Sequence, residues 1–173
     1  TAARRRDEIL QALAGVSGPV SAAALAARLG VSRQVVVGDV ALLRAAGSPI
    51  VATPRGYVLG GGQEGGGVRC TVACRHGLDG LLDELYTVAD CGCGVLDVTV
   101  EHPVYGQLSG QLQVFSRYDA DVFWDALQKN GAQPLCSLTG DIHLHTLVCP
   151  DEARKARVLA ALEEKGYLMG LEK

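Results

Sequence analysis

Four histidines and all six cysteines occupy the second part of a chain of 173 residues. His143 and His145 are two positions apart in an apolar segment typical of a strand, so both side chains leave the same face of a sheet. Two neighbouring imidazoles can hold nickel, zinc, copper or iron, and a carboxylate would complete the ligand set. The spacing therefore predicts a metal site, with a solvated outer sheet face as the alternative.

His76 stands where the first strand of this part passes into a helix, and Glu84 follows two turns further along that helix. The first and last strands of the expected sheet can be neighbours in space, which would bring both residues to the histidine pair. A metal held in this way could also activate water, so a metal-dependent hydrolase is an alternative to a binding function. A third possibility is a metal-sensing repressor, in which the ion itself is the signal.

The six cysteines are expected to be mostly buried, reduced thiols, because no export signal accompanies them. Cys91 and Cys93 are too close in sequence for an ordinary disulfide or for a Cys-x-x-Cys zinc knuckle. The N-terminal arginines are not followed by an apolar signal core, and no stretch approaches the roughly 20 apolar residues of a membrane span. A cytoplasmic protein without membrane contact is expected.

Charge divides the chain near residue 60. Residues 1–60 carry a net charge of +4 and residues 61–173 a net charge of −7. Six glycines lie among the eight residues 60–67, a composition typical of a flexible tether. The sequence therefore predicts a basic, DNA-binding domain over residues 1–59, a linker over 60–67 and a second domain over 68–173.

Three helices are expected in the first domain, the second capped by Ser21 and the third by Ser32. Gly30 can end the second helix in the left-handed conformation, which gives the short turn of a helix-turn-helix. Two short apolar segments flank the turn 53–56 as a hairpin. The first domain is therefore predicted to be a winged helix-turn-helix, and residues 24–36 resemble the helix-turn-helix of small bacterial repressors.

The third helix of this domain is the expected recognition helix. Arg33 can contact guanine and Gln34 adenine through two hydrogen bonds each, while Arg55 at the hairpin tip suits phosphate or the minor groove. The residues expected to contact operator DNA are Ser32, Arg33, Gln34, Arg44 and Arg55. A winged helix used only for protein contacts is the alternative.

The second domain shows the element order β-α-β-β-α-β-α in its apolar pattern. This order fits a ferredoxin-like α+β domain with an added C-terminal helix, in which one face of a four-stranded antiparallel sheet is covered. Such a sheet does not define a function, so function must be argued from a site.

Two segments of this domain, V-x-V-E-H-P-V-Y-G at 98–106 and L-T-G-D-I-H-L-H-T at 138–146, resemble the three-histidine (3H) domain. A winged helix followed by that domain is similar to the niacin-responsive transcriptional repressors of NAD-precursor uptake and synthesis. The resemblance covers nearly the whole chain. It implies a homodimeric DNA-binding repressor, no enzymatic activity, and nicotinic acid as co-repressor.

The same resemblance implies a divalent metal ion, nickel or zinc, in the regulatory domain. The implied ligands are His76, Glu84, His143 and His145, with Asp83 the nearest competitor for the carboxylate. His102 and Tyr105 are assigned to the effector pocket. The glycine-rich linker and the cysteines are not features of the family, so a role for cysteine at the metal stays open.

Overall fold

The computed structural model describes residues 1–60 and 67–170. The chain divides into two units, Thr1–Glu64 and Gly65–Lys173, and each has its own apolar core. The boundary falls in the glycine-rich run. Residues 61–66 of the predicted linker lie outside the described ranges.

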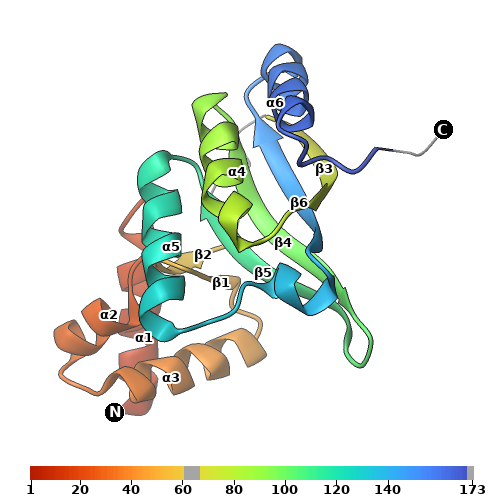
Figure 1. Ribbon diagram of the computed structural model, residues 1–173. Coiled ribbons are helices and arrows are strands. Elements are labelled where there is room, and N and C mark those ends of the chain that lie inside the picture. The colour runs from red at the N-terminus through yellow and green to blue at the C-terminus, as the bar shows by residue number, and fades with distance from the viewer. Residues whose placement is uncertain (61–66, 171–173) are drawn as a thin grey trace. The chain divides into compact units, whose positions relative to one another are not determined.

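The first unit is a helix-turn-helix followed by a hairpin, as predicted (Figure 1). Its elements are α1 (Ala2–Ala14), α2 (Ala22–Leu29), α3 (Arg33–Ala45), β1 (Ile50–Thr53) and β2 (Gly56–Leu59). The Ser21 hydroxyl accepts the N–H of Ala24 at 3.0 Å and the Ser32 hydroxyl that of Val35 at 3.3 Å, so both predicted caps are present. Gly30 ends α2 in the left-handed conformation, with φ of 64°.

An ion pair fastens α1 to α3 inside the first unit. The buried carboxylate of Asp39 on α3 accepts a hydrogen bond from Arg5 Nη2 at 3.3 Å, and Arg6 Nη1 lies 3.6 Å from the same oxygen. Arg5 holds the pKa of Asp39 below its usual value. Arg4 pairs with Glu8 at 3.1 Å. The three N-terminal arginines therefore have partners within the unit, and part of its positive charge stabilises the fold.

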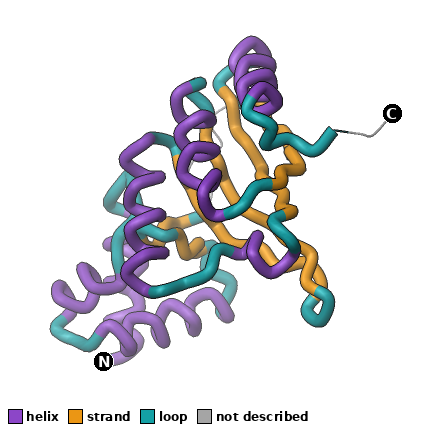
Figure 2. The backbone as a smooth tube through the Cα atoms, viewed as in Figure 1, coloured by secondary structure: helices purple, strands orange, loops and turns teal. Residues whose placement is uncertain are grey.

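The second unit has the predicted order of helices and strands, with a short 3-10 helix added before the last strand (Figure 2). Its elements are β3 (Val68–Arg75), α4 (Leu78–Asp90), β4 (Gly94–His102), β5 (Gly106–Val114), α5 (Arg117–Asn130), η1 (Leu135–Thr139), β6 (Ile142–Cys149) and α6 (Glu152–Glu164). Leu85 of α4, Ala120 of α5 and Val158 of α6 are buried in one core with the inward side chains of the strands. All three helices therefore cover the same face of the sheet.

The strands are antiparallel neighbours in the order β3-β6-β4-β5. A ferredoxin-like sheet has the first and third strands at its centre, whereas here the fourth and second, β6 and β4, are central. The ferredoxin-like strand order is therefore not confirmed. The expected adjacency of the first and last strands is present, because β3 pairs with β6 along its whole length.

The segment that follows α6 lies against the outer edge of β3. Arg75 N–H donates to the Tyr167 carbonyl at 2.9 Å, and Met169 N–H donates to the Ala73 carbonyl at 2.9 Å. This contact satisfies edge groups of β3 that would otherwise face solvent. In residues 1–60 and 67–170, no helix combines the length and apolar character needed to cross a bilayer.

Candidate metal centre and nucleic-acid interface

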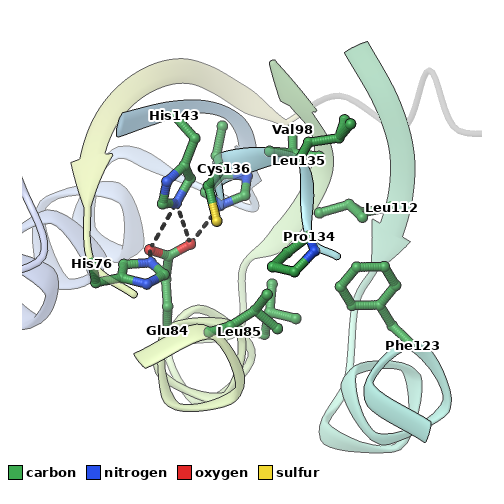
Figure 3. A pocket seen from close by; sticks show the side chains of 12 residues that line it. His76, Glu84, Leu85, Val98, Leu112, Phe123, Pro134, Leu135, Cys136 and His143 are labelled. Atoms are coloured by element: carbon green, nitrogen blue, oxygen red, sulfur yellow. Dashed lines mark hydrogen bonds and ion pairs between the residues drawn. The ribbon is translucent and has the colours of Figure 1, made fainter. Parts of the chain in front are cut away.

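The carboxylate of Glu84 lies at the centre of a group of three histidines (Figure 3). It contacts Nε2 of His76 and of His145, and Nε2 of His143 is 3.4 Å from both carboxylate oxygens. The imidazole of His143 is 4.6 Å from that of His76 and 4.8 Å from that of His145, centroid to centroid. The structure thus brings together all four residues that the sequence predicted as ligands.

Three elements deliver these side chains. His143 and His145 leave the covered face of β6 and are 2% and 5% exposed, which rules out a solvated outer face for the pair. His76 follows directly after β3, the neighbour of β6. Glu84 points from α4 toward the sheet and is 1% exposed. The spacing of two residues in β6 therefore places His143 and His145 on one face, and the pairing of β3 with β6 brings His76 beside them.

Each imidazole is held by its other ring nitrogen. Nδ1 of His76, His143 and His145 lies 2.9, 2.9 and 2.7 Å from the carbonyl oxygens of Gly77, Asp141 and Asp97, respectively. A carbonyl only accepts hydrogen bonds, so Nδ1 carries the proton in each ring. In a neutral ring Nε2 then presents a lone pair to the carboxylate, and in a charged ring it donates a hydrogen bond to it. This backbone support is the arrangement that orients metal-binding histidines.

Lone pairs on three imidazoles and on a carboxylate repel one another unless a positive charge lies among them. Burial acts to raise the pKa of Glu84, but hydrogen bonds from the three histidines lower it below its usual range. Burial acts to lower the pKa of His76, and its pairing with Glu84 raises that pKa overall. A divalent ion would supply the positive charge without protonating the rings, so the donor set fits a metal.

A thiol also reaches this cluster. Cys74 on β3 is directly opposite His143 on β6, and the possible ligand atoms of Cys74, Glu84 and His143 all lie within 4.8 Å of one another. Burial, and then the charge of Glu84, raise the pKa of the Cys74 thiol. Cys74 lies two positions before His76 at the end of β3, and this spacing, which places both side chains on one face, was the sequence signal that could have indicated Cys74.

Asp83 is not in the cluster. Its carboxylate accepts hydrogen bonds from Lys165 Nζ at 3.0 Å and from the Tyr167 hydroxyl at 2.7 Å. The Tyr167 ring packs edge-on against His76, with centroids 5.0 Å apart. Asp83 therefore anchors the segment after α6, which in turn supports His76. Tyr167 is a site residue that could not be found from local sequence patterns, because the contact depends on how the chain returns after α6.

A narrow pocket opens beside the cluster, with about 350 Å³ of space between atoms, part of it open to solvent. Its polar end is formed by the three histidines and Glu84, and apolar side chains form the rest (Figure 3). The apolar lining is Leu81, Leu85, Val98, Leu112, Phe123, Pro134 and Leu135, together with Cys136. A mostly apolar hollow with a few convergent polar groups is typical of a small-molecule site.

His102 and Tyr105 lie elsewhere, at the turn between β4 and β5. His102 Nδ1 accepts the backbone N–H groups of Val104 and Tyr105, each at 3.1 Å, so this imidazole shapes the turn. Tyr105 is 74% exposed. His102 lines a separate shallow hollow with residues of η1 and β6. The structure does not bring these two residues to the histidine cluster.

The predicted DNA-contacting residues lie on α3 and the hairpin of the first unit. Arg33 and Gln34 are exposed in the first turn of α3, behind the cap Ser32, and Arg44 is exposed in its last turn. Arg33 and Arg55 line one hollow together with the N-terminal end of α2. The third helix and the hairpin of the first unit thus each contribute an arginine to the lining of the same hollow.

Comparisons with known proteins agree with both units. Residues 69–171 match the 3H domain family and residues 5–58 match a helix-turn-helix domain family. The chain is 43% identical over 165 residues to the probable transcription repressor NiaR of Thermotoga maritima, covering 95% of this chain and 93% of that protein. It is 40% identical over 169 residues to the transcription repressor NadR of Bacillus subtilis, covering 96% and 94%.

Proposed function

Because this chain belongs to the 3H-domain family of helix-turn-helix transcription repressors, we propose that it represses transcription in response to nicotinic acid through a divalent metal in its second unit. The relatives' names support a DNA-binding regulator rather than the metal-dependent hydrolase considered from the sequence. The observation that carries the metal and effector roles is the buried Glu84 carboxylate faced by three imidazole nitrogens.

Operator DNA is the partner of the first unit. Arg33 and Gln34 read base edges in the major groove, and Arg55 contacts the backbone or the minor groove beside them. Ser32 and Arg44 lie at the two ends of α3 and contact phosphates. The shared hollow of Arg33 and Arg55 supports this arrangement.

The metal ligands proposed are His76, Glu84, His143 and His145, and the ion is nickel or zinc, since both accept imidazole. When bound, the ion supplies a Lewis-acid position that can accept the carboxylate or the pyridine nitrogen of nicotinic acid. The chain's own residues do the rest. Three backbone carbonyls orient the imidazoles, and the core around α4 excludes water from the carboxylate.

Nicotinic acid suits the pocket beside the cluster. Its flat ring matches a hollow lined by leucines, Val98 and Phe123, and its polar atoms match the histidine end. The hollow at His102, with Tyr105 nearby, is the other location for the effector, as the resemblance implies. Binding in the first pocket would couple α4, η1 and β6, because each contributes lining residues.

A homodimer is part of the proposal, because one recognition helix covers too few base pairs for good specificity. The face of the sheet away from the helices supports it. Ile142 and Leu144 are each 39% exposed there, with Arg75 on β3 at one side and Glu101 on β4 at the other. A face with basic and acidic sides is complementary to a second copy related by a two-fold axis.

The test is fluorescence anisotropy with the DNA upstream of the gene, using metal-loaded and chelator-treated protein, each with and without nicotinic acid. We expect nicotinic acid to raise DNA affinity only in the metal-loaded protein. The size of the increase is set by how much more tightly nicotinic acid binds the DNA-binding state of the repressor than the other state. Affinity that follows metal alone would identify a metal-sensing repressor. Absence of DNA binding under all four conditions would refute the proposal.

A further inference from the structure

We infer that Cys74 is a fifth protein ligand of the metal, so that the centre in this chain combines a thiolate with the imidazoles and the carboxylate. The inference rests on the metal centre of the proposed function and adds to it a residue outside the expected ligand set. It concerns the sulfur of one buried side chain on β3.

The register of β3 and β6 places the thiol of Cys74 beside His143. Cys74 and His143 are partners across β3 and β6, so their side chains leave the same covered face side by side. Cys74 is 0% exposed, and its sulfur shares a cluster with ligand atoms of Glu84 and His143, all within 4.8 Å of one another. Sulfur and nitrogen on opposite sides of one zinc ion would be about 4.4 Å apart, from bond lengths of about 2.3 and 2.1 Å. Small side-chain adjustments are enough to reach such an arrangement.

The side from which the thiol approaches is also informative. His76, Glu84, His143 and His145 all line the pocket beside the cluster, whereas Cys74 is not among its lining residues. Sulfur therefore reaches the cluster from the strand side. A coordination position that faces the pocket stays available for an effector.

Charge balance favours the same assignment. A divalent ion with three neutral imidazoles and one carboxylate leaves a net charge of +1 among side chains that are almost fully buried. A buried net charge is costly. When the sulfur–metal bond forms, the thiol releases its proton to solvent, and the thiolate makes the centre neutral. No electron transfer is involved.

A thiolate also changes which ions the site prefers. Carboxylate and imidazole alone accept a wide range of divalent ions, whereas thiolate selects soft or borderline ones. We therefore expect zinc, nickel and cobalt to be retained and magnesium and manganese to be excluded.

Cobalt reports sulfur ligation directly. Cobalt-loaded full-length protein should show an intense near-ultraviolet sulfur-to-cobalt charge-transfer band together with weaker visible bands of the bound ion. In Cys74→Ser the charge-transfer band should disappear while visible bands and cobalt content persist. Cys70→Ser is the matched control, since Cys70 lies on the same strand and the same face as Cys74 but is absent from the ligand cluster and from the pocket lining. That variant should keep the band.

A band that is missing from the parent protein despite bound cobalt, or that survives in Cys74→Ser, would overturn the inference. Failure of the parent to take up any ion would overturn the metal centre of the proposed function as well, so the two failures are distinguishable. X-ray absorption of the nickel- or zinc-loaded parent avoids any folding defect of the variant. It should show a sulfur neighbour at about 2.3 Å, and a shell of only nitrogen and oxygen would contradict Cys74 as a ligand.

Discussion

In each histidine of the cluster, both ring nitrogens have an assigned role. Nδ1 is committed to a backbone carbonyl and Nε2 to the carboxylate of Glu84. His102, which has a different environment, uses Nδ1 to accept two backbone N–H groups of a turn. This difference separates the residues that can bind a metal from one that stabilises a local turn, and it makes His102 a matched control.

Replacement of both His143 and His145 by alanine should abolish metal binding, because two of the donors on the sheet are lost. Elemental analysis after dialysis measures the metal content, and DNA anisotropy measures the nicotinic acid response, which should be lost with it. His102→Ala should keep the full metal content. A metal-free double variant that still responds fully to nicotinic acid would separate the effector from the metal.

Arg33→Ala should weaken binding to the operator by about 1–3 kcal/mol and relax the preference at one base position. Arg55→Ala should instead reduce affinity on all sequences and flatten the dependence on salt, because a phosphate contact releases counterions regardless of sequence. Anisotropy over a salt series, with operator and scrambled DNA, distinguishes the two effects. Lys129→Ala in the second unit is the control, and parental binding by both arginine variants would argue against the assigned interface.

At the scale of elements, one buried carboxylate adds an ion pair to the apolar contact between α1 and α3. Asp39→Asn keeps the shape of the side chain but removes the charge that pairs with Arg5 and Arg6. We expect the free energy of unfolding of the first unit to fall by roughly 1–3 kcal/mol at neutral pH. Glu8→Gln removes a pair whose Arg4 side chain is 82% exposed, and should change stability by less than about 0.5 kcal/mol.

The effect of Asp39→Asn should depend on pH in a defined direction. The folded-state pKa of Asp39 lies below its unfolded-state value of about 3.9. Its stabilisation is therefore complete above that value and is lost as the pH falls through the lowered folded-state pKa. Denaturant unfolding should show the parent and the variant converging at low pH. A constant difference down to that range would mean that the pair with Arg5 contributes little.

Local signals in the sequence predicted the helices and strands. Contacts between residues far apart in the chain determine the strand order and the surroundings of the site, which the sequence did not predict. Ser21, Gly30 and Ser32 mark helix ends through bonds to residues a few positions away, so α2 and α3 could be predicted closely. Ser116 caps α5 in the same local way, and Asp119 in the first turn accepts the Phe115 N–H in return. Such reciprocal bonds set a helix start without contacts from distant parts of the chain.

The complete order of the strands in the sheet could not be predicted in the same way. The spacing of His143 and His145 fixed their common face, but nothing local determines that β6 lies between β3 and β4. The contribution of Cys74 depends on that pairing, and the support from Tyr167 depends on the return of the chain along β3. The candidate ligands were therefore predictable, whereas their full surroundings were not.

At the scale of the whole molecule, self-association should use the open face of the sheet. Leu144→Glu places a charge in its apolar strip and should weaken the dimer about tenfold or more, equivalent to about 1.4 kcal/mol. Sedimentation of the full chain at tens of micromolar measures the change. Tyr118→Glu on α5, where the side chain is 69% exposed, is the control. Equal association of all three proteins, or a monomeric parent, would exclude this face.

The contact between Glu84 and His143 joins residues 59 positions apart in the sequence. An ion bound there would join the two ends of this long loop only in the folded chain, because the ligand set does not exist in the unfolded one. Its binding energy therefore stabilises the folded state by mass action, and removing the ion removes that stability. At a free metal concentration one hundred times its Kd, the second unit should gain about 2.7 kcal/mol. Its melting temperature would then report the metal supply, and a chelator should lower it while the first unit melts unchanged.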